Sequence, residues 1–326
     1  MSDTESEDWA FPDEMQPDPA ALHFDLNRTL DAVITLKADI PSDALTAETL
    51  GTERAGNGVL ISEDGVILTI GYLITEAESV WITTNRGTVV QGYPVAYDQA
   101  TGFGLVRALG PLGLRPVPLG SSARLRPGDR VYLLGHGGHG HALKARLVDK
   151  REFAGYWEYL LEEALITAPA HPNWSGAALV DEDGALLGVG SLLMQEVIDE
   201  KLLQTNMIVP VDLLSPILEN LLATGRSGAP GRPWLGLFAA DADGQVVVAG
   251  LADYGPAAEA GIEQGDLVLE VGGSRVSTLA DFLRAVWAQG PAGSPIPLTL
   301  ARDTELIRLE VPSVDRYDLL KKPRLH

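Results

Sequence analysis

Ser175 is the residue whose surroundings most suggest chemistry. It lies in the stretch Asn173-Trp174-Ser175-Gly176-Ala177-Ala178, where small residues follow the serine at once. Hydrolases commonly present a nucleophilic serine on a tight turn followed by small residues, because bulk there would block the substrate. A serine hydroxyl is a weak nucleophile until a neighbouring base takes its proton. The function therefore depends on whether a base, and an acid that orients the base, stand elsewhere in the chain.

Four of the six histidines lie in the same part of the chain as Ser175. His136, His139 and His141 are spaced through the glycine-rich run 135–141, and His171 precedes the serine by four positions. Imidazole serves as a general base and as a ligand for zinc or copper. The spacing matches no recognised metal-ligand pattern, so three interpretations remain open. We favour a plain flexible loop with no cofactor over a metal site or a catalytic or recognition role.

The composition is that of an acidic globular protein. The 326 residues are 45% apolar, carry a formal net charge of −21 and include no cysteine. This length favours two domains, and the negative charge disfavours nucleic acid and anionic membrane surfaces while favouring polypeptide partners. The lack of cysteine excludes disulfides, thiolate metal sites and cysteine nucleophiles. An acidic start, without a secretory signal or an apolar run of about 20 residues, predicts a cytoplasmic protein that does not span a membrane.

Short apolar runs interrupted by Gly, Asp and Asn predict a mainly β chain. Helical spacing is confined to a few stretches, among them 211–224 and 279–288. The stretch 225–233 is rich in Gly and Pro and predicts a linker between two domains. The predicted order is an acidic disordered tail at 1–25, a β-rich domain at 26–224, the linker, a second domain at 234–313 and a C-terminal tail at 314–326.

Four segments follow one another in an order and spacing that a known family shares. They are 56–59 with 67–69, the run 120–135, the Ser175 turn, and Gly255-Pro256-Ala257-Ala258-Glu259-Ala260-Gly261-Ile262 followed by Gly265-Asp266. Together they resemble the HtrA family of trypsin-fold serine proteases with a C-terminal PDZ domain, and their collinearity is more specific than any single motif. The resemblance implies a mainly β fold, with a chymotrypsin-like double β-barrel at 26–224 and a PDZ domain at 234–313.

The resemblance also implies a position for each member of a serine protease triad. The family's histidine follows the threonine of I-L-T by three residues, and here Tyr72 stands in that place. Gly102 stands at the position of the aspartate, and Asn173 replaces the glycine whose backbone N–H, with that of Ser175, forms the oxyanion hole. A tyrosine with an ordinary pKa of about 10 is protonated at pH 7 and cannot replace imidazole as a base. We therefore predict a pseudoprotease, with Ser175 a vestigial nucleophile, that binds polypeptide as a scaffold, adaptor or regulatory subunit.

Two other functions remain open. A working or weakly active serine hydrolase would use Ser175 with a non-standard base, such as a nearby histidine. A metal-binding variant would use the loop that carries His136, His139 and His141.

The second domain is expected to read peptides. Trp234-Leu235-Gly236-Leu237 matches the family's loop whose backbone N–H groups receive a peptide's terminal carboxylate. A helix carrying Leu279, Phe282 and Leu283 would form the other wall of the groove, although the same side chains are equally compatible with core packing. The implied partner is a protein or peptide, in particular a C-terminal peptide. Family members often form trimers, so a homo-oligomer or a subunit of a larger complex stays open.

Overall fold

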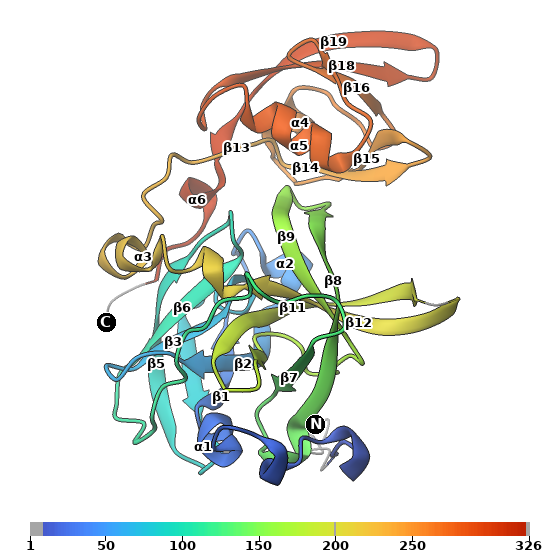
Figure 1. The fold of residues 1–326 in the computed structure, drawn as a ribbon. Coiled ribbons are helices and arrows are strands. Elements are labelled where there is room, and N and C mark those ends of the chain that lie inside the picture. The colour runs from blue at the N-terminus through green and yellow to red at the C-terminus, as the bar shows by residue number, and fades with distance from the viewer. Residues whose placement is uncertain (1–8, 199, 324–326) are drawn as a thin grey trace, which may run out of the picture. The chain divides into compact units, whose positions relative to one another are not determined.

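The computed structural model describes residues 9–198 and 200–323, which divide into two compact units. The first comprises the described residues up to Arg151 and Glu163–Ser227, and the second comprises Glu152–Glu162 and Gly228–Lys321. Both units are built mainly of antiparallel strands (Figure 1). The predicted mainly β fold is therefore confirmed.

Two closed six-stranded barrels form the framework of the first unit. Closure leaves no strand edge open, because the first and last strands of each sheet pair with each other. The first barrel has the strand order β1-β2-β3-β6-β5-β4. Its strands are β1 Val33–Asp39, β2 Glu53–Leu60, β3 Val66–Ile70, β4 Ser79–Thr83, β5 Val89–Tyr97 and β6 Phe103–Ala108. Along the chain, the short helix α2 Ala47–Leu50 lies between β1 and β2, and η3 Gly71–Leu73 lies between β3 and β4.

The second barrel has the strand order β10-β11-β12-β9-β8-β7. Its strands are β7 Arg130–Leu134, β8 Ala142–Gly155, β9 Tyr159–Ala168, β10 Ala178–Val180, β11 Leu186–Ile198 and β12 Lys201–Pro210. The strands β8 and β9 meet at a turn, and the ends of both strands at this turn belong to the second unit. The sequence prediction had assigned this whole stretch to the barrel domain, because nothing in its local pattern marks a change of unit.

The N-terminal segment differs from the disordered tail predicted for residues 1–25. Residues 9–25 contain the turns η1 Asp13–Met15 and η2 Pro19–Ala21 and lead into α1 Leu26–Asp31. Phe11 and Met15 pack against the core of the second barrel, and the N–H of Phe11 donates to the carbonyl oxygen of Gly140 at 2.9 Å. The apolar side chains therefore outweigh the acidic charge in residues 9–25, while residues 1–8 lie outside the described part of the chain.

The stretch predicted as one helix at 211–224 is divided in two. It forms η5 Val211–Leu213 and α3 Leu218–Thr224. Pro216 lies between them, and proline removes a donor and disfavours helical geometry in the residue before it. The helix α3 ends at Gly225, which adopts the left-handed conformation with φ 74°.

The second unit is an antiparallel sheet accompanied by short helices. Its strand order is β14-β15-β16-β18-β19, so β14 is an edge strand, and β17 pairs with β16. The apolar face of α5, capped at its start by the Thr278 side chain, packs into this unit's core. The elements are β13 Pro233–Trp234, β14 Leu237–Ala242, β15 Gln245–Leu251, α4 Pro256–Glu259, β16 Leu267–Val271, β17 Ser274–Arg275, α5 Leu279–Trp287, β18 Pro295–Arg302, β19 Glu305–Pro312, β20 Val314–Asp315 and α6 Arg316–Leu319.

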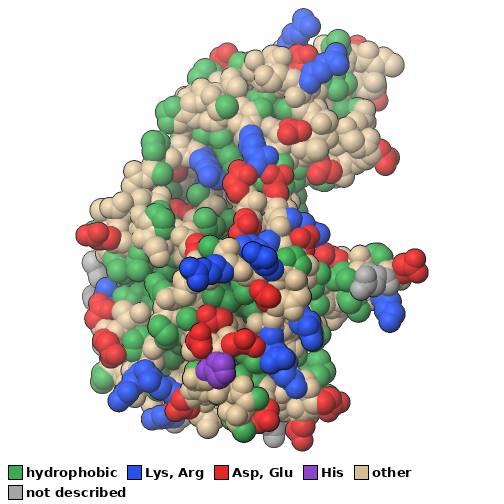
Figure 2. All heavy atoms as spheres, in the orientation of Figure 1, with side chains coloured by type: hydrophobic (Ala, Val, Ile, Leu, Met, Phe, Trp, Pro, Cys, Tyr) green, Lys and Arg blue, Asp and Glu red, His purple; other side chains and the backbone are tan. Residues whose placement is uncertain are grey.

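Both predicted boundaries of the second domain shift in the structure. Pro233, predicted as linker, begins β13, and β13 pairs with β20, which was predicted as tail. On the face shown in Figure 2, acidic and basic side chains are interspersed, so the net charge is not gathered there into a single acidic patch. Within the described part of the chain, no helix is long and apolar enough to cross a membrane.

Candidate functional site

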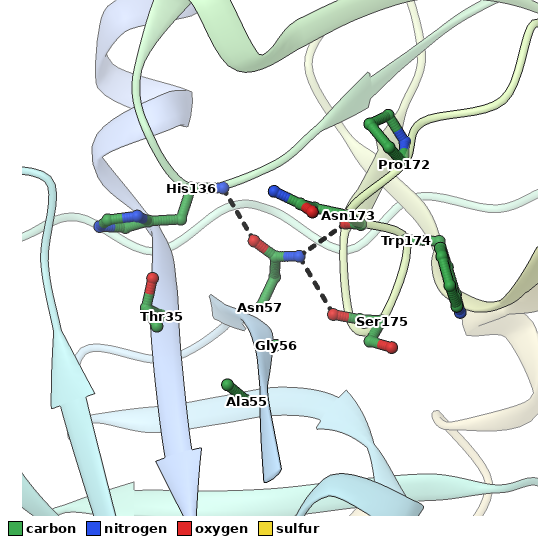
Figure 3. A pocket seen from close by; sticks show the side chains of 9 residues that line it. All are labelled: Thr35, Ala55, Gly56, Asn57, His136, Pro172, Asn173, Trp174 and Ser175. Carbon is green, nitrogen blue, oxygen red and sulfur yellow. Dashed lines mark hydrogen bonds between the residues drawn. The ribbon is translucent and has the colours of Figure 1, made fainter. Parts of the chain in front are cut away.

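The turn that carries Ser175 is held against strand β2 by Asn57. The backbone N–H of Asn57 donates to the Ser175 carbonyl oxygen at 2.7 Å. Its side-chain Nδ2 donates to the carbonyl oxygens of Asn173 at 2.8 Å and of Ser175 at 3.1 Å (Figure 3). Gly176 is required here because a Cβ would lie 1.9 Å from the Asn57 carbonyl oxygen, and its φ is +72°. The strand and the turn therefore fix the position of the serine.

Tyr72, the residue aligned with the family's histidine, contacts Ser175. The residue lies in η3 directly after β3, and its Oη is 2.6 Å from Ser175 Oγ. The same hydroxyl donates to the carbonyl oxygen of Ser191 at 2.8 Å. A phenol has one proton and a carbonyl has none. The Ser175 hydroxyl therefore donates a hydrogen bond to Tyr72 Oη and keeps its own proton.

The ionisation of Tyr72 decides whether this contact can activate the serine. Burial raises the pKa of Tyr72 to about 12, against the opposing effect of hydrogen bonds with Ser175 and Trp174. At neutral pH the phenol is protonated, so it can accept a hydrogen bond from Ser175 but cannot remove its proton. The contact holds the Ser175 hydroxyl in place.

The position of the acid holds only backbone. Gly102 has φ 81°, its N–H donates to the Asp98 carbonyl oxygen at 2.8 Å, and its own carbonyl oxygen accepts from Gly71 N–H at 2.7 Å. The nearest carboxylate in sequence, Asp98, accepts from the backbone N–H of Thr101 at 2.9 Å and from its hydroxyl at 2.8 Å. The Asp98 carboxylate thus closes the turn at Gly102 and shows no hydrogen bond with Tyr72.

The backbone at the oxyanion-hole position is turned toward His171. The N–H of Asn173 donates to His171 Nδ1 at 3.0 Å, and His171 Nε2 lies 3.0 Å from the carbonyl oxygen of His141. These partners assign Nδ1 as the acceptor and Nε2 as the donor, so the imidazole is neutral. Burial lowers the pKa of His171 to about 4, which keeps this arrangement at neutral pH. The Asn173 N–H is consequently bonded to the His171 imidazole and does not point to an oxyanion position.

A pocket of about 360 Å³ adjoins Ser175 and includes His136 in its lining. In Figure 3 the ring of His136 points away from Ser175, and Asn57 lies between the two residues. The backbone N–H of His136 donates to Asn57 Oδ1 at 2.8 Å, and burial lowers the pKa of the His136 imidazole. The ring therefore shares the pocket with the serine but is not aimed at it.

The predicted histidine loop forms the turn η4 His139–His141. His139 Nε2 lies 3.0 Å from the carbonyl oxygen of Pro17, and the ring of His141 lies 4.2 Å from that of Trp9. The histidines thus pair with the N-terminal segment. Among residues 9–198 and 200–323, no three His, Cys, Asp or Glu side chains gather in a way that could hold a metal ion.

The residues predicted to bind peptide divide into two groups. Leu279, Phe282 and Leu283 of α5 are buried in the core of the second unit, as are the side chains of Leu235 and Leu237. The side chains named for a pocket thus serve as core, which the sequence had left open, and Trp234 is buried as well. The backbone of the loop remains the candidate binding element.

Sequence reasoning missed the residue that contacts this loop. The carboxylate of Glu158 accepts hydrogen bonds from the backbone N–H groups of Leu235, Gly236 and Leu237. Glu158 lies in the aromatic run 153–159, which contains Phe, Trp and two Tyr residues. That composition is the only local signal, and it does not identify a contact with a loop so far along the chain.

Comparison with known proteins agrees with both parts of this arrangement. The profile of the trypsin-like peptidase domain matches residues 56–189, and that of the PDZ domain matches residues 233–312. The chain is similar to the serine endoprotease DegS of Salmonella typhimurium, with 25% identity over 322 residues that cover 94% of this chain and 88% of DegS. It is also similar to the chloroplastic protease Do-like 1 of Arabidopsis thaliana, with 26% identity over 326 residues that cover 92% and 73% of the two chains.

Solved structures agree with the fold. The HtrA-type protease AlgW, solved with a decapeptide, has a TM-score of 0.54 at 20% identity, covering 92% of this chain and 98% of that one. The serine endoprotease from Yersinia pestis has a TM-score of 0.52 at 22% identity, covering 89% and 96%. The two domain profiles match this chain in the order that the sequence motifs predict, with the peptidase domain before the PDZ domain. The chain belongs to the HtrA-like family of trypsin-fold serine proteases that carry a C-terminal PDZ domain.

Proposed function

We propose that this chain is a catalytically inactive HtrA-like protease homologue that binds polypeptide as a scaffold, adaptor or regulatory subunit. The observation that carries the proposal is the 2.6 Å contact between Tyr72 Oη and Ser175 Oγ. In a working triad the group at this place takes the proton of the serine. Here it is a phenol whose pKa lies at about 12, so the proton stays on Ser175 at neutral pH.

The backbone around Ser175 supports the same proposal. Substrate hydrolysis needs preorganised N–H donors where negative charge develops on the carbonyl oxygen. The Asn173 N–H points to His171 Nδ1 instead. The Asn173 peptide would have to turn before its N–H could stabilise an oxyanion. An active enzyme would also need a base in place of Tyr72 and an acid in place of Gly102.

Peptide binding is the positive half of the proposal. It is supported by the PDZ domain match and by the solved complex of the similar AlgW with a decapeptide. The loop at Leu235, Gly236 and Leu237 already holds a carboxylate by three backbone N–H groups. A peptide's terminal carboxylate is the ligand that such a loop would take.

A fluorophosphonate probe tests the absence of catalysis. Such a probe reacts with activated serines, so we expect no labelling of Ser175 in the wild-type chain, with trypsin as the positive control. Labelling of wild type that disappears in Ser175→Ala would refute inactivity and favour a weakly active hydrolase. The observation that keeps this second candidate in view is the presence of His136 in the pocket of Ser175.

Peptide binding is tested by fluorescence anisotropy with labelled decapeptides that end in a free carboxylate. The matched control is the same set with amidated C-termini, which lack the charge that the loop would hold. We expect the free acids to bind about tenfold or more tightly than the amides, as for loss of a charged hydrogen-bond acceptor. Equal affinity for both sets would contradict recognition of the terminal carboxylate.

A further inference from the structure

The loop at 235–237 already binds a carboxylate within the second unit. Glu158 Oε1 accepts from the backbone N–H of Leu235 at 3.1 Å, of Gly236 at 2.8 Å and of Leu237 at 3.1 Å. Glu158 Oε2 also accepts from Leu235 N–H, at 3.2 Å. Three successive N–H groups aimed at one point form an anion site. Their ligand here is a side chain of this protein.

The conformation of the loop suits this purpose. Gly236 has φ +70°, and a Cβ there would lie 3.0 Å from the Trp234 ring and 3.2 Å from Ala252 Cβ. A left-handed glycine at this place lets the neighbouring N–H groups converge. Glu158 is 6% exposed, so its carboxyl group has exchanged water for these backbone donors.

The rest of segment 152–162 is anchored on the same unit. Leu160 is buried in its core cluster. The ring of Tyr156 lies edge-on to that of Phe238 in β14, with centroids 6.1 Å apart. Arg284 of α5 binds the carboxylates of Glu152 and Glu162. The segment thus contacts the loop, the edge strand β14 and the helix α5, which are the three elements that a PDZ peptide would use.

The backbone conformation of Glu158 is also consistent with a side chain held by the loop. Its φ is 61°, in the left-handed region that few residues other than glycine occupy. A non-glycine residue persists there where its surroundings hold it. The hydrogen bonds of the carboxylate supply such a restraint, and burial raises the pKa of Glu158 to about 7 against the pull of the N–H donors and Arg316.

We propose that Glu158 is an internal ligand of the PDZ carboxylate-binding loop, and that segment 152–162 occupies the place of a peptide's C-terminal end. A foreign peptide with a free carboxylate then binds only when this segment withdraws. The occupancy of the loop stands on the contacts above. Its regulatory meaning rests on the proposed peptide-binding function.

Amide hydrogen exchange on the full chain tests the occupancy without any peptide. We expect the amides of Leu235, Gly236 and Leu237 to be protected in wild type and to exchange about tenfold or more faster in Glu158→Ala, because their hydrogen bonds to the Glu158 carboxyl oxygens are lost. Glu163→Ala is the matched control, since Glu163 directly follows the segment and pairs with Lys150 rather than with the loop or α5. Glu158→Gln keeps the side-chain volume and provides a folded variant without the charge. Equal exchange at these amides in wild type and both Glu158 variants would overturn the proposal.

Competition is tested with fluorescein-labelled decapeptides that end in an apolar residue with a free carboxylate. We expect Glu158→Ala to bind them about tenfold more tightly than wild type and Glu163→Ala to bind as wild type does. Faster exchange in Glu158→Ala with unchanged peptide affinity would overturn the competition. Faster exchange with no binding by any variant would support the internal ligand and refute the peptide-binding function, so the two failures are distinguishable.

Discussion

The Ser175 cleft and the PDZ loop each contain a side chain of the protein itself where a working group or a ligand would be expected. At Ser175 the occupant is the phenol of Tyr72, which receives the serine's hydrogen bond. At the loop the occupant is the carboxylate of Glu158, which three backbone N–H groups hold. In both places polar groups that would serve a substrate or peptide are satisfied internally.

The two occupants differ in how they are attached. Tyr72 belongs to a turn whose backbone is itself bonded, since its carbonyl oxygen accepts from Arg54 Nη1 at 2.8 Å and Gly71 N–H donates to Gly102 at 2.7 Å. Glu158 lies at a turn between two strands and reaches the loop through its side chain alone. Residue identity therefore sets the chemistry at Ser175, whereas a side-chain contact sets the occupancy of the loop.

The first test restores the missing triad members. We expect Tyr72→His with Gly102→Asp to raise the rate of fluorophosphonate labelling by about 100-fold or more, the range for a general base. Tyr72→His alone should give a smaller gain, because nothing then orients the imidazole. The same substitutions on a Ser175→Ala background are the control. Because Gly102 has φ 81°, the double variant must first be shown to keep the wild-type urea midpoint. No gain in such a folded variant would show that the peptide at Asn173, and not the triad, limits the site.

The second test concerns the buried histidine beside the Ser175 turn. The pKa of His171 is lowered to about 4 from 6.5 in the fold, so its contribution to stability is present above pH 6.5 and is lost as pH falls through 4. Across this window the free energy of unfolding should fall by up to about 3 kcal/mol. Urea unfolding at pH 7.5, 5.5 and 4.5 measures it. His171→Asn, which does not titrate, should show a smaller decline, and an equal decline would contradict the assignment.

The third test uses the acidity of Glu158. Its pKa is raised to about 7 from 4.5 by burial, so docking of the segment is favoured below pH 4.5 and weakens as pH rises through 7. Decapeptide affinity should therefore increase from pH 5.5 to pH 8 by roughly tenfold. The peptide's own carboxylate, with a pKa of about 3.5, stays ionised throughout. Glu158→Gln should bind with little pH dependence, and a wild-type curve that is flat or falls with pH would refute the displacement.

The smallest expected effect comes from removing the Tyr72 hydroxyl. Tyr72→Phe leaves Ser175 Oγ and the Ser191 carbonyl oxygen without this partner, so the free energy of unfolding should fall by about 1 to 3 kcal/mol. Activity toward the fluorophosphonate should stay absent. Tyr254→Phe is the control, because Tyr254 is 94% exposed. A stability loss equal to that of the control would show that the contact contributes nothing.

Much of the fold was predictable because it depends on local patterns. Short apolar runs indicated the strands, and the family resemblance that the collinear motifs carry implied the barrels and the PDZ domain. The helix predicted at 211–224 was interrupted because a proline overrides apolar spacing. The prediction of a disordered tail was wrong for residues 9–25, because Phe11 and Met15 pack against the core of the second barrel.

The sequence by itself determined the identities that matter at Ser175. Tyr72 and Gly102 stand at fixed intervals within motifs, so the residues at the positions of the base and the acid could be named without a structure. Only the tertiary structure decided which hydrogen bonds the Tyr72 hydroxyl and the Glu158 carboxylate make. The direction of the Tyr72 hydroxyl depends on the Ser191 carbonyl oxygen. The ligand of the loop is separated from Leu235 by 77 residues, and backbone N–H groups carry no sequence signal, so packing alone brings Glu158 to the place of a peptide's end.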